Sequence, residues 1–551
     1  MPPDGDPLRH FGHLKFGRID AMRKIFLAAF FGFITVVVSV TAQTPTPTPT
    51  PSASPLPVAS PTPIQKQVQT LADLQARIRS RLLSPELRRG HVGVKIVSMN
   101  TGKLVFEQNS EKYFMPASNM KNFTVATAIE KLTPQFRFVT SVYAPAMPDS
   151  TGTIKGGLRI FGRGDVSIST RFSEGNYYKG LDELADKIAT AGVKRIEGDL
   201  IADETHFVGN PVPGEWEWDD LQWEYGAEIS ALPINDNAID ITVKPGMSGY
   251  PCAVTMLPFN PVVRIVNQCV TSAAGTLRTL KIEKKVDRNI IEISGALPVG
   301  NAGFRGSVTV SRPAELFVAL LKERLTARGI VVTGGTRAMN VKLPGPVAPV
   351  FVEIAKYESL PLSVIAAQTM KPSQNMYTET LLWTLGEQAR SASSIPGGGT
   401  PSASTATSAD LGISAVKRFL NEIGVAPDGI IQHDGSGLSR HNLITPSAVV
   451  QLYTYMGRQS RFSQAWRDSL TIGGVDGTLR RRFAGTRASG NVRGKTGTID
   501  QVSALSGYVR TAAGEELAFS IVVNGVNEAG MRTSAIDDMV VYLANFDGRV
   551  D

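Results

Sequence analysis

Histidine is scarce in this chain, which has six histidines in 551 residues. Two of them precede Met22, and the other four show no spacing typical of zinc ligands. This scarcity argues against a Ser-His-Asp triad and against a metallopeptidase. No glycine-rich phosphate loop stands at a junction between a strand and a helix. We therefore expect neither a metal nor a cofactor.

Cysteine is scarcer still, with Cys252 and Cys269 as the two in the chain. In an exported protein this spacing suits one local disulfide, and the alternative is a pair of buried free thiols. Neither arrangement makes the two residues catalytic.

A long apolar run is also missing. The run from Ile25 to Val40 covers 16 residues, whereas a spanning helix needs about 20. It follows the basic pair Arg23-Lys24 and ends in the small residues Thr41-Ala42, which is typical of a secretory signal. We predict a cleaved signal peptide at 1–42 and an exported, periplasmic protein, with an uncleaved anchor as the alternative. Because no cysteine lies near the cleavage site, a lipid-anchored lipoprotein is excluded.

The formal net charge of +8 is modest for a chain of this size. No basic block is interleaved with aromatic residues, so nucleic acid is not an expected partner. The charge permits attraction to an acidic polymer or surface but does not establish it.

Composition and periodicity divide the chain into regions. Alternating Pro and Thr predict an extended linker at 43–65. Helix and hairpin patterns at 66–147 and 353–551 flank many short strand patterns at 148–352. The sequence thus predicts an α+β fold, in which a catalytic domain in two parts is interrupted by a large β-rich insertion of two subdomains. Two helices are expected inside the insertion, near 181–190 and 313–327.

Ser118 and Lys121 stand at the start of a predicted helix. Their spacing places a hydroxyl and an amine one turn apart on the same helical face. Pro116 is typical of a helix start. The unpaired backbone N–H groups of that first turn stabilise developing negative charge. The pair can therefore make a nucleophile, although a Ser-x-x-Lys motif alone arises by chance in most long proteins.

Two more motifs follow: Ser373-Gln374-Asn375, between two predicted helices, and Lys495-Thr496-Gly497-Thr498, leading into a strand. Taken alone, the first is more often a helix cap and the second more often part of a turn. The three motifs in this order match the signature of serine penicillin-recognising enzymes.

The long interval between Lys121 and Ser373 is more than a class A β-lactamase allows. With a large insertion at this point, the sequence resembles the D-alanyl-D-alanine carboxypeptidase/endopeptidase family, also called the penicillin-binding protein 4 type or peptidase family S13. This resemblance covers 68–551 and implies a β-lactamase/penicillin-binding transpeptidase-like domain with an antiparallel sheet flanked by helices. Further stretches similar to the family are 162–165, 198–203, 434–440 and 474–479.

The resemblance implies a role for each catalytic residue. Ser118 attacks the D-Ala–D-Ala carbonyl and forms an acyl-enzyme. Lys121 takes the serine proton, which requires burial and a neighbouring cation, Lys495, to lower its pKa. Ser373 relays the proton to the leaving amine, and Asn375 orients Lys121 and the substrate amide.

The last motif is expected to bind the substrate. By resemblance, Lys495, Thr496, Gly497 and Thr498 form the strand edge on which the substrate and its terminal carboxylate lie. The backbone N–H groups of Ser118 and Thr498 form the oxyanion hole.

The predicted function is that of a serine-type D-Ala-D-Ala carboxypeptidase and DD-endopeptidase acting on peptidoglycan stem peptides. Expected partners are peptidoglycan peptides and, as covalent inhibitors, β-lactam antibiotics, with at most loose membrane association. One alternative is a β-lactamase-like hydrolase using the same serine, against which the insertion argues. A second is a non-catalytic cell-wall-binding protein that keeps the fold.

Overall fold

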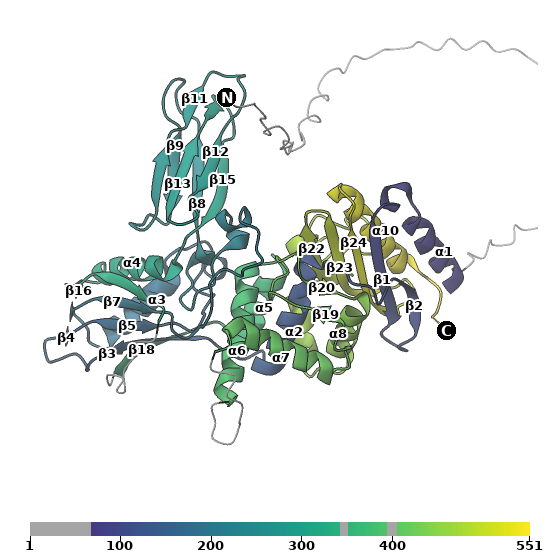
Figure 1. Ribbon diagram of the computed structural model, residues 1–551, viewed down its shortest axis with the longest axis horizontal. Coiled ribbons are helices and arrows are strands. Elements are labelled where there is room, and N and C mark those ends of the chain that lie inside the picture. The colour runs from purple at the N-terminus through teal and green to yellow at the C-terminus, as the bar shows by residue number, and fades with distance from the viewer. Residues whose placement is uncertain (1–67, 342–350, 394–404, 551) are drawn as a thin grey trace, which may run out of the picture. The chain divides into compact units, whose positions relative to one another are not determined.

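The computed structural model describes residues 68–341, 351–393 and 405–550 (Figure 1). These residues belong to one compact unit of the chain. The predicted signal peptide, the 43–65 linker and most of the loop at 391–407 lie outside the described residues. Within the described ranges, no helix combines the length and the apolar character needed to cross a membrane.

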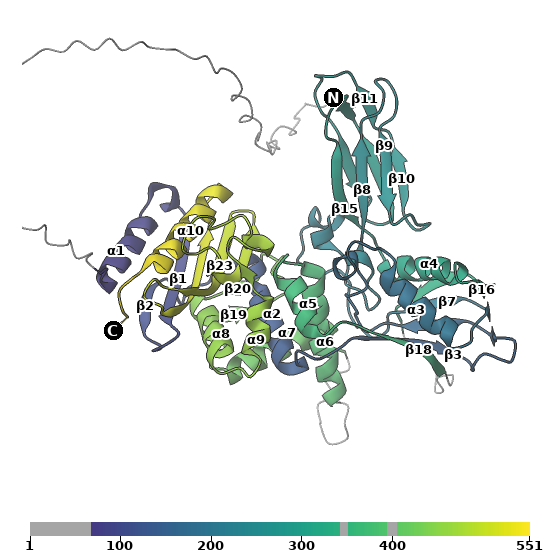
Figure 2. The same ribbon diagram turned by 180° about the vertical axis from the view of Figure 1, so that it is seen from behind.

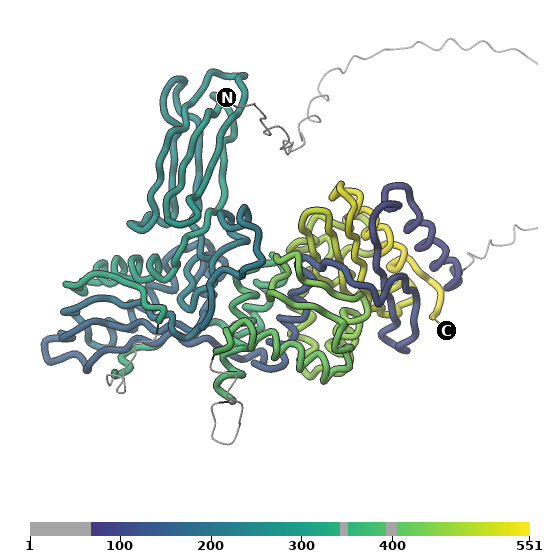
Figure 3. The backbone as a smooth tube through the Cα atoms, in the orientation of Figure 1, coloured from purple at the N-terminus to yellow at the C-terminus, as the bar shows by residue number. Residues whose placement is uncertain are grey.

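A six-stranded antiparallel sheet joins the two ends of the described chain in the order β2-β1-β24-β23-β22-β21. Figure 3 shows the purple N-terminal segment beside the yellow C-terminal one. The strands are β1 (His91–Ser98), β2 (Leu104–Gln108), β21 (Thr471–Ile472), β22 (Arg493–Ile499), β23 (Val502–Arg510) and β24 (Glu516–Asn524).

Helices cover both faces of this sheet (Figure 2). Along β23, Leu505 and Val509 pack with the helices of one face, whereas Ala504 and Tyr508 pack with those of the other. This alternation is expected of a strand, whose successive side chains point to opposite faces. The first face holds α1 (Leu71–Leu82) and α10 (Ala529–Asn545), and the second holds α2 (Lys121–Leu132) and α8 (Pro446–Arg458). Four more helices pack into the core of the second face: α5 (Leu362–Met370), α6 (Asn375–Ser393), α7 (Ser408–Glu422) and α9 (Ser463–Ser469).

A five-stranded sheet forms the first part of the β-rich region, in the order β17-β7-β5-β3-β18. Its strands are β3 (Val139–Ala144), β5 (Leu158–Phe161), β7 (Leu200–Asp203), β17 (Thr336–Met339) and β18 (Val352–Glu358). Beside it lies a small sheet of β4 (Thr153–Lys155), β6 (Arg195–Glu197) and β16 (Val331–Val332). The two helices expected here are present as α3 (Lys179–Thr190) and α4 (Pro313–Thr326). Because β3 pairs with β18, the strand before the predicted boundary at 148 shares a sheet with the strand after the insertion.

A second group of strands is nested between β7 and α4. Its three small sheets have the orders β15-β8-β9, β10-β13-β12 and β11-β14. The strands are β8 (Ala238–Lys244), β9 (Ala253–Leu257), β10 (Arg264–Asn267), β11 (Val270–Ser272), β12 (Lys281–Lys284), β13 (Ile290–Ser294), β14 (Ala296–Pro298) and β15 (Phe304–Thr309). The fold is thus α+β with an antiparallel sheet flanked by helices, as predicted.

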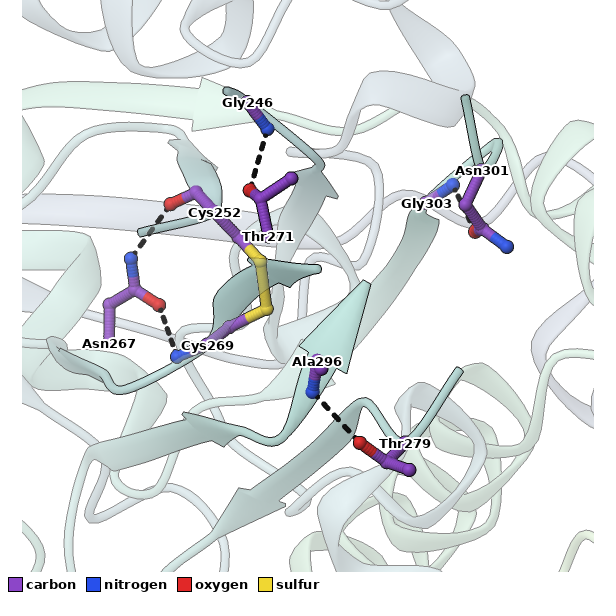
Figure 4. Close-up of a disulfide and its surroundings, with 9 residues drawn as sticks. All are labelled: Gly246, Cys252, Asn267, Cys269, Thr271, Thr279, Ala296, Asn301 and Gly303. Atoms are coloured by element: carbon purple, nitrogen blue, oxygen red, sulfur yellow. Dashed lines mark hydrogen bonds between the residues drawn. A yellow bond between two sulfur atoms is a disulfide. The ribbon is translucent and has the colours of Figure 1, made fainter. Parts of the chain in front are cut away.

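The two cysteines form a disulfide inside this nested group (Figure 4). Both are buried, and their Cα atoms lie 5.4 Å apart. Asn267 bonds to the backbone of both, donating to the Cys252 carbonyl and accepting from the Cys269 N–H. The expectation of one local disulfide holds, and the free-thiol alternative does not.

Removing this disulfide should loosen the nested strands and leave the catalytic sheet intact. A crosslink between residues 17 apart stabilises by about 3 kcal/mol, because it restricts the unfolded chain. We expect the Cys252→Ala/Cys269→Ala variant to exchange amide hydrogens much faster at 246–272 and at the wild-type rate in β22–β24. Mild reduction of the wild type should give the same pattern. Equal exchange at 246–272 in both proteins would contradict the prediction.

Candidate active site

Ser118 lies in the 3₁₀ turn η2 (Ala117–Met120), which runs directly into α2. Pro116 caps this turn, as its position in the sequence predicted. Ala117 adopts a positive φ of 47°, a costly conformation for a residue with a side chain, which is common beside active sites. The side chain of Ser118 is half-buried, so its hydroxyl is accessible at the start of an otherwise buried helix.

The amine of Lys121 is fully buried and has three partners. Its Nζ lies 3.0 Å from Ser118 Oγ, 2.5 Å from Asn375 Oδ1 and 2.7 Å from the Ser436 carbonyl oxygen. The structure therefore brings together Ser118, Lys121 and Asn375, as the sequence motifs suggested. Ser436 comes from the segment at 434–440, one of the stretches that are similar to the family in sequence.

Burial lowers the pKa of Lys121 from its ordinary value to about 7, against the attraction of Asp434 and Glu379. A large fraction of this amine is therefore neutral near neutral pH, as a proton acceptor must be. We expected Lys495 to lower the Lys121 pKa. Burial, rather than the Lys495 charge, accounts for the lowered pKa of Lys121, and burial together with the Lys121 charge holds the pKa of Lys495 well below its usual value.

A second serine and lysine face each other across the site. Lys495, on β22, donates from Nζ to Ser373 Oγ at 2.9 Å and to the Thr496 carbonyl at 2.8 Å. Ser373 lies between α5 and α6 and has a positive φ of 67°. The second and third motifs thus meet as well, and the fully buried Lys495 amine donates to two oxygen acceptors.

Strand β22 packs closely against the turn that carries Ser118. Asn119 donates from Nδ2 to the Lys495 carbonyl at 3.1 Å. A Cβ added at Gly497 would lie 2.4 Å from the Pro116 carbonyl oxygen, so glycine is required for this approach. Thr496 bonds through its hydroxyl to that of Thr478 at 2.8 Å, and the side chain of Thr498 is exposed.

Two buried carboxylates, those of Asp434 and Glu379, shape the turn that supplies the Ser436 carbonyl. Glu379, on α6, accepts from the N–H groups of Gly435 and Ser436 at 2.9 and 2.7 Å. Asp434 accepts from the N–H of Gly437 at 2.7 Å. Burial and the Asp434 charge raise the pKa of Glu379 to about 8. Sequence analysis missed Glu379 and Asn119, because single residues inside helices carry no local signal of such a role.

The β-rich region also reaches this site. Asn375 donates from Nδ2 to the Tyr225 carbonyl at 2.8 Å, and Trp216 donates from Nε1 to Asp434 Oδ2 at 3.0 Å. Each contact fixes a group that in turn positions Lys121. The insertion is therefore part of the support of the site.

In this site the Ser118 hydroxyl lies beside the buried, partly neutral amine of Lys121, and the second pair, Ser373 and Lys495, lies opposite. Together with the helix-flanked sheet, this arrangement defines the class as serine-type hydrolases. Comparison with known proteins identifies the family within this class. The chain belongs to the D-Ala-D-Ala carboxypeptidase 3 (S13) family, whose model matches residues 74–546. The resemblance seen in the sequence motifs is thereby confirmed.

Several relatives share most of this length. A D-alanyl-D-alanine carboxypeptidase of an Actinomadura species is 35% identical over 490 residues, which cover 87% of this chain and 86% of the relative. The carboxypeptidase DacB of Haemophilus influenzae is 25% identical over 455 residues, covering 82% and 89%. The crystal structure of penicillin binding protein 4 from Haemophilus influenzae shares the fold, with a TM-score of 0.68 and 24% identity over 84% of this chain and 94% of that one.

Replacing Gly437 should push the turn at 434–437 away from the backbone that carries Ser118. This glycine has a φ of 82°, and an added Cβ would lie 1.9 Å from the Ala117 carbonyl oxygen, directly under Ser118. We expect Gly437→Ala to lower the free energy of unfolding by roughly 2–4 kcal/mol, measured by urea denaturation. Gly530→Ala is the matched control, because nothing lies within 4 Å of its added Cβ. Similar unfolding midpoints for the two variants would refute the steric argument.

Proposed function

We propose that the protein is a serine-type D-Ala-D-Ala carboxypeptidase that also cleaves peptide cross-bridges of peptidoglycan. The observation that carries this proposal is the contact of the Lys121 amine with Ser118 Oγ, opposite the Lys495–Ser373 pair. Family membership and the names of the relatives agree with it.

In this proposal the first step is attack on the penultimate D-alanine. Ser118 Oγ bonds to the carbonyl carbon while its proton passes to the neutral Lys121 amine. The negative charge that develops on the carbonyl oxygen is stabilised by the backbone N–H groups of Ser118 and Thr498. One such donor typically contributes about 3–4 kcal/mol.

The second step releases the terminal D-alanine. Ser373 relays a proton to the leaving amine, and Asn375 holds Lys121 and the substrate amide in place. Water then hydrolyses the ester to Ser118 and returns the free enzyme.

The strand edge at 495–498 is proposed to hold the terminal carboxylate of the substrate. A carboxylate beside Lys495 favours its protonated form and so opposes the effect of burial on the pKa. Thr498 is exposed and free to contact the substrate from the neighbouring strand position. Binding of the carboxylate and protonation of Lys495 would then be coupled.

We also propose that the chain works in the periplasm after removal of residues 1–42. The basic start, the short apolar run and the small residues after it support export. The Cys252–Cys269 disulfide agrees, since such bonds persist in oxidising compartments. We further propose a catalytic domain in two parts, predicted at 66–147 and 353–551, except that β3 and β18 at their inner ends belong to the sheet of the inserted region.

A fluorescent penicillin tests the nucleophile. Wild type should form a covalent adduct that survives denaturation, and Ser118→Ala should form none, because it lacks the attacking oxygen. Ser84→Ala is a control outside the site that should label normally. An adduct on Ser118→Ala would rule out the assignment.

The pH dependence of acylation tests the base. With a Lys121 pKa of about 7, the neutral amine is lost as pH falls through 7. The acylation rate should therefore drop about tenfold per pH unit below that point and level off above it. Lys121→Ala should lower the rate by roughly 10²–10⁴-fold, whereas the surface variant Lys131→Ala should match wild type in stopped-flow assays. A flat profile between pH 5 and 9 would exclude Lys121 as the base.

A further inference from the structure

The nested strand group exposes large apolar side chains at one of its ends. Met247, Tyr250, Val270, Leu277 and Val299 are 70%, 59%, 46%, 80% and 41% exposed. Singly exposed apolar residues are ordinary on protein surfaces, whereas a contiguous group of them marks an interaction site. We call these five residues the apolar tip.

Strand pairing shows that the tip residues gather at one end. The chain enters this group at Ala238 and leaves at Thr309, and these two residues are partners in the β8–β15 pair. At the other end of the same pair, Val243 faces Phe304. The loops that follow β8 and precede β15 therefore lie about 20 Å from the entry point, at about 3.4 Å per residue. Figures 1 and 2 show β11 at this same end.

Backbone contacts join the loops of the tip. The Thr271 N–H donates to the Tyr250 carbonyl at 2.8 Å, and the Val299 N–H donates to the Ser272 carbonyl at 2.9 Å. Pro251 and Val270 form an isolated bridge. The buried Cys252–Cys269 disulfide crosslinks the loop that contains Tyr250 to the segment that contains Val270 (Figure 4). The exposed side chains thus project from loops that are held together by backbone hydrogen bonds and a disulfide.

The charged side chains nearest the tip are basic. Residues 241–282 contain no Asp or Glu, and neither do residues 293–314. Lys244, Arg278 and Lys281 are exposed beside the tip. Among the described residues, none of the three forms an ion pair with a carboxylate. The tip is therefore apolar at its centre and basic at its rim, and the acidic pair that follows along the strands, Glu283 and Glu292, lies two residues further from it.

We propose that the apolar tip docks on an anionic phospholipid surface. Apolar side chains inserted at the level of the headgroups, with cations beside them, are the combination by which proteins bind to a membrane without spanning it. Tyrosine is favoured at that depth, because its ring is apolar and its hydroxyl is polar. A rim whose exposed charges are Lys244, Arg278 and Lys281 suits lipid phosphates better than a protein partner, whose surface carries both signs of charge.

Vesicle co-sedimentation tests this docking. The full chain is mixed with vesicles of three parts phosphatidylcholine to one part phosphatidylglycerol, and the bound fraction is measured against lipid concentration. We expect Met247→Ser/Leu277→Ser to bind at least about fivefold more weakly than wild type. We expect Lys244→Glu/Arg278→Glu to lose the preference for these vesicles over pure phosphatidylcholine.

The matched control is Leu257→Ser/Phe259→Ser, which removes two exposed apolar side chains beside the entry point, where Leu257 pairs with Asp240. It should bind like wild type. All variants keep residues 25–40, so any contribution of that apolar run is common to them. Penicillin labelling and circular dichroism verify folding. Docking at the tip is overturned if wild type fails to sediment with the vesicles, or if the tip and control variants bind equally well.

Discussion

The burial of one amine, that of Lys121, constrains the rest of the site. A buried nitrogen must be surrounded by acceptors, because unsatisfied polar groups are costly away from water. The three acceptors here come from Ser118, Asn375 and Ser436, and the last two are 254 and 315 residues further along the chain. Helix α2, helix α6 and the turn at 434–437 therefore have to pack within hydrogen-bonding distance of one point. The close approaches at Gly437 and Gly497 follow from that packing.

The β-rich region takes part in the same constraint. Through Tyr225 and Trp216 it binds Asn375 and Asp434, which both act on Lys121. The inserted region of some 200 residues thus supplies two hydrogen bonds to the site. A catalytic domain without the insertion would need other partners for Asn375 and Asp434. The motifs on either side of the insertion nevertheless meet, since Lys121 bonds to Asn375 and Ser373 to Lys495.

The sequence was informative where a local rule applied. Helical spacing predicted the Ser118–Lys121 pair, alternation predicted β1 and β23, and the order of three motifs predicted the family. It was uninformative where partners are distant along the chain. The pairing of β3 with β18 depends on strands separated by the whole insertion. Glu379 and Asn119 act through backbone groups of other segments, and the lowered pKa of Lys121 depends on burial, so none of these has a local signature.

The pairing of β1 with β24 limits the order in which the protein can fold. His91 pairs with Asn524, so the first strand of the catalytic sheet cannot complete its ladder until almost the whole chain is available. Contacts of such long range slow folding, because a long loop must close before they form. A chain that ends before β24 would leave both β1 and β23 without a partner strand on the side where β24 lies. Loss of β24 should therefore divide the catalytic sheet into two separate pieces rather than shorten it at one edge.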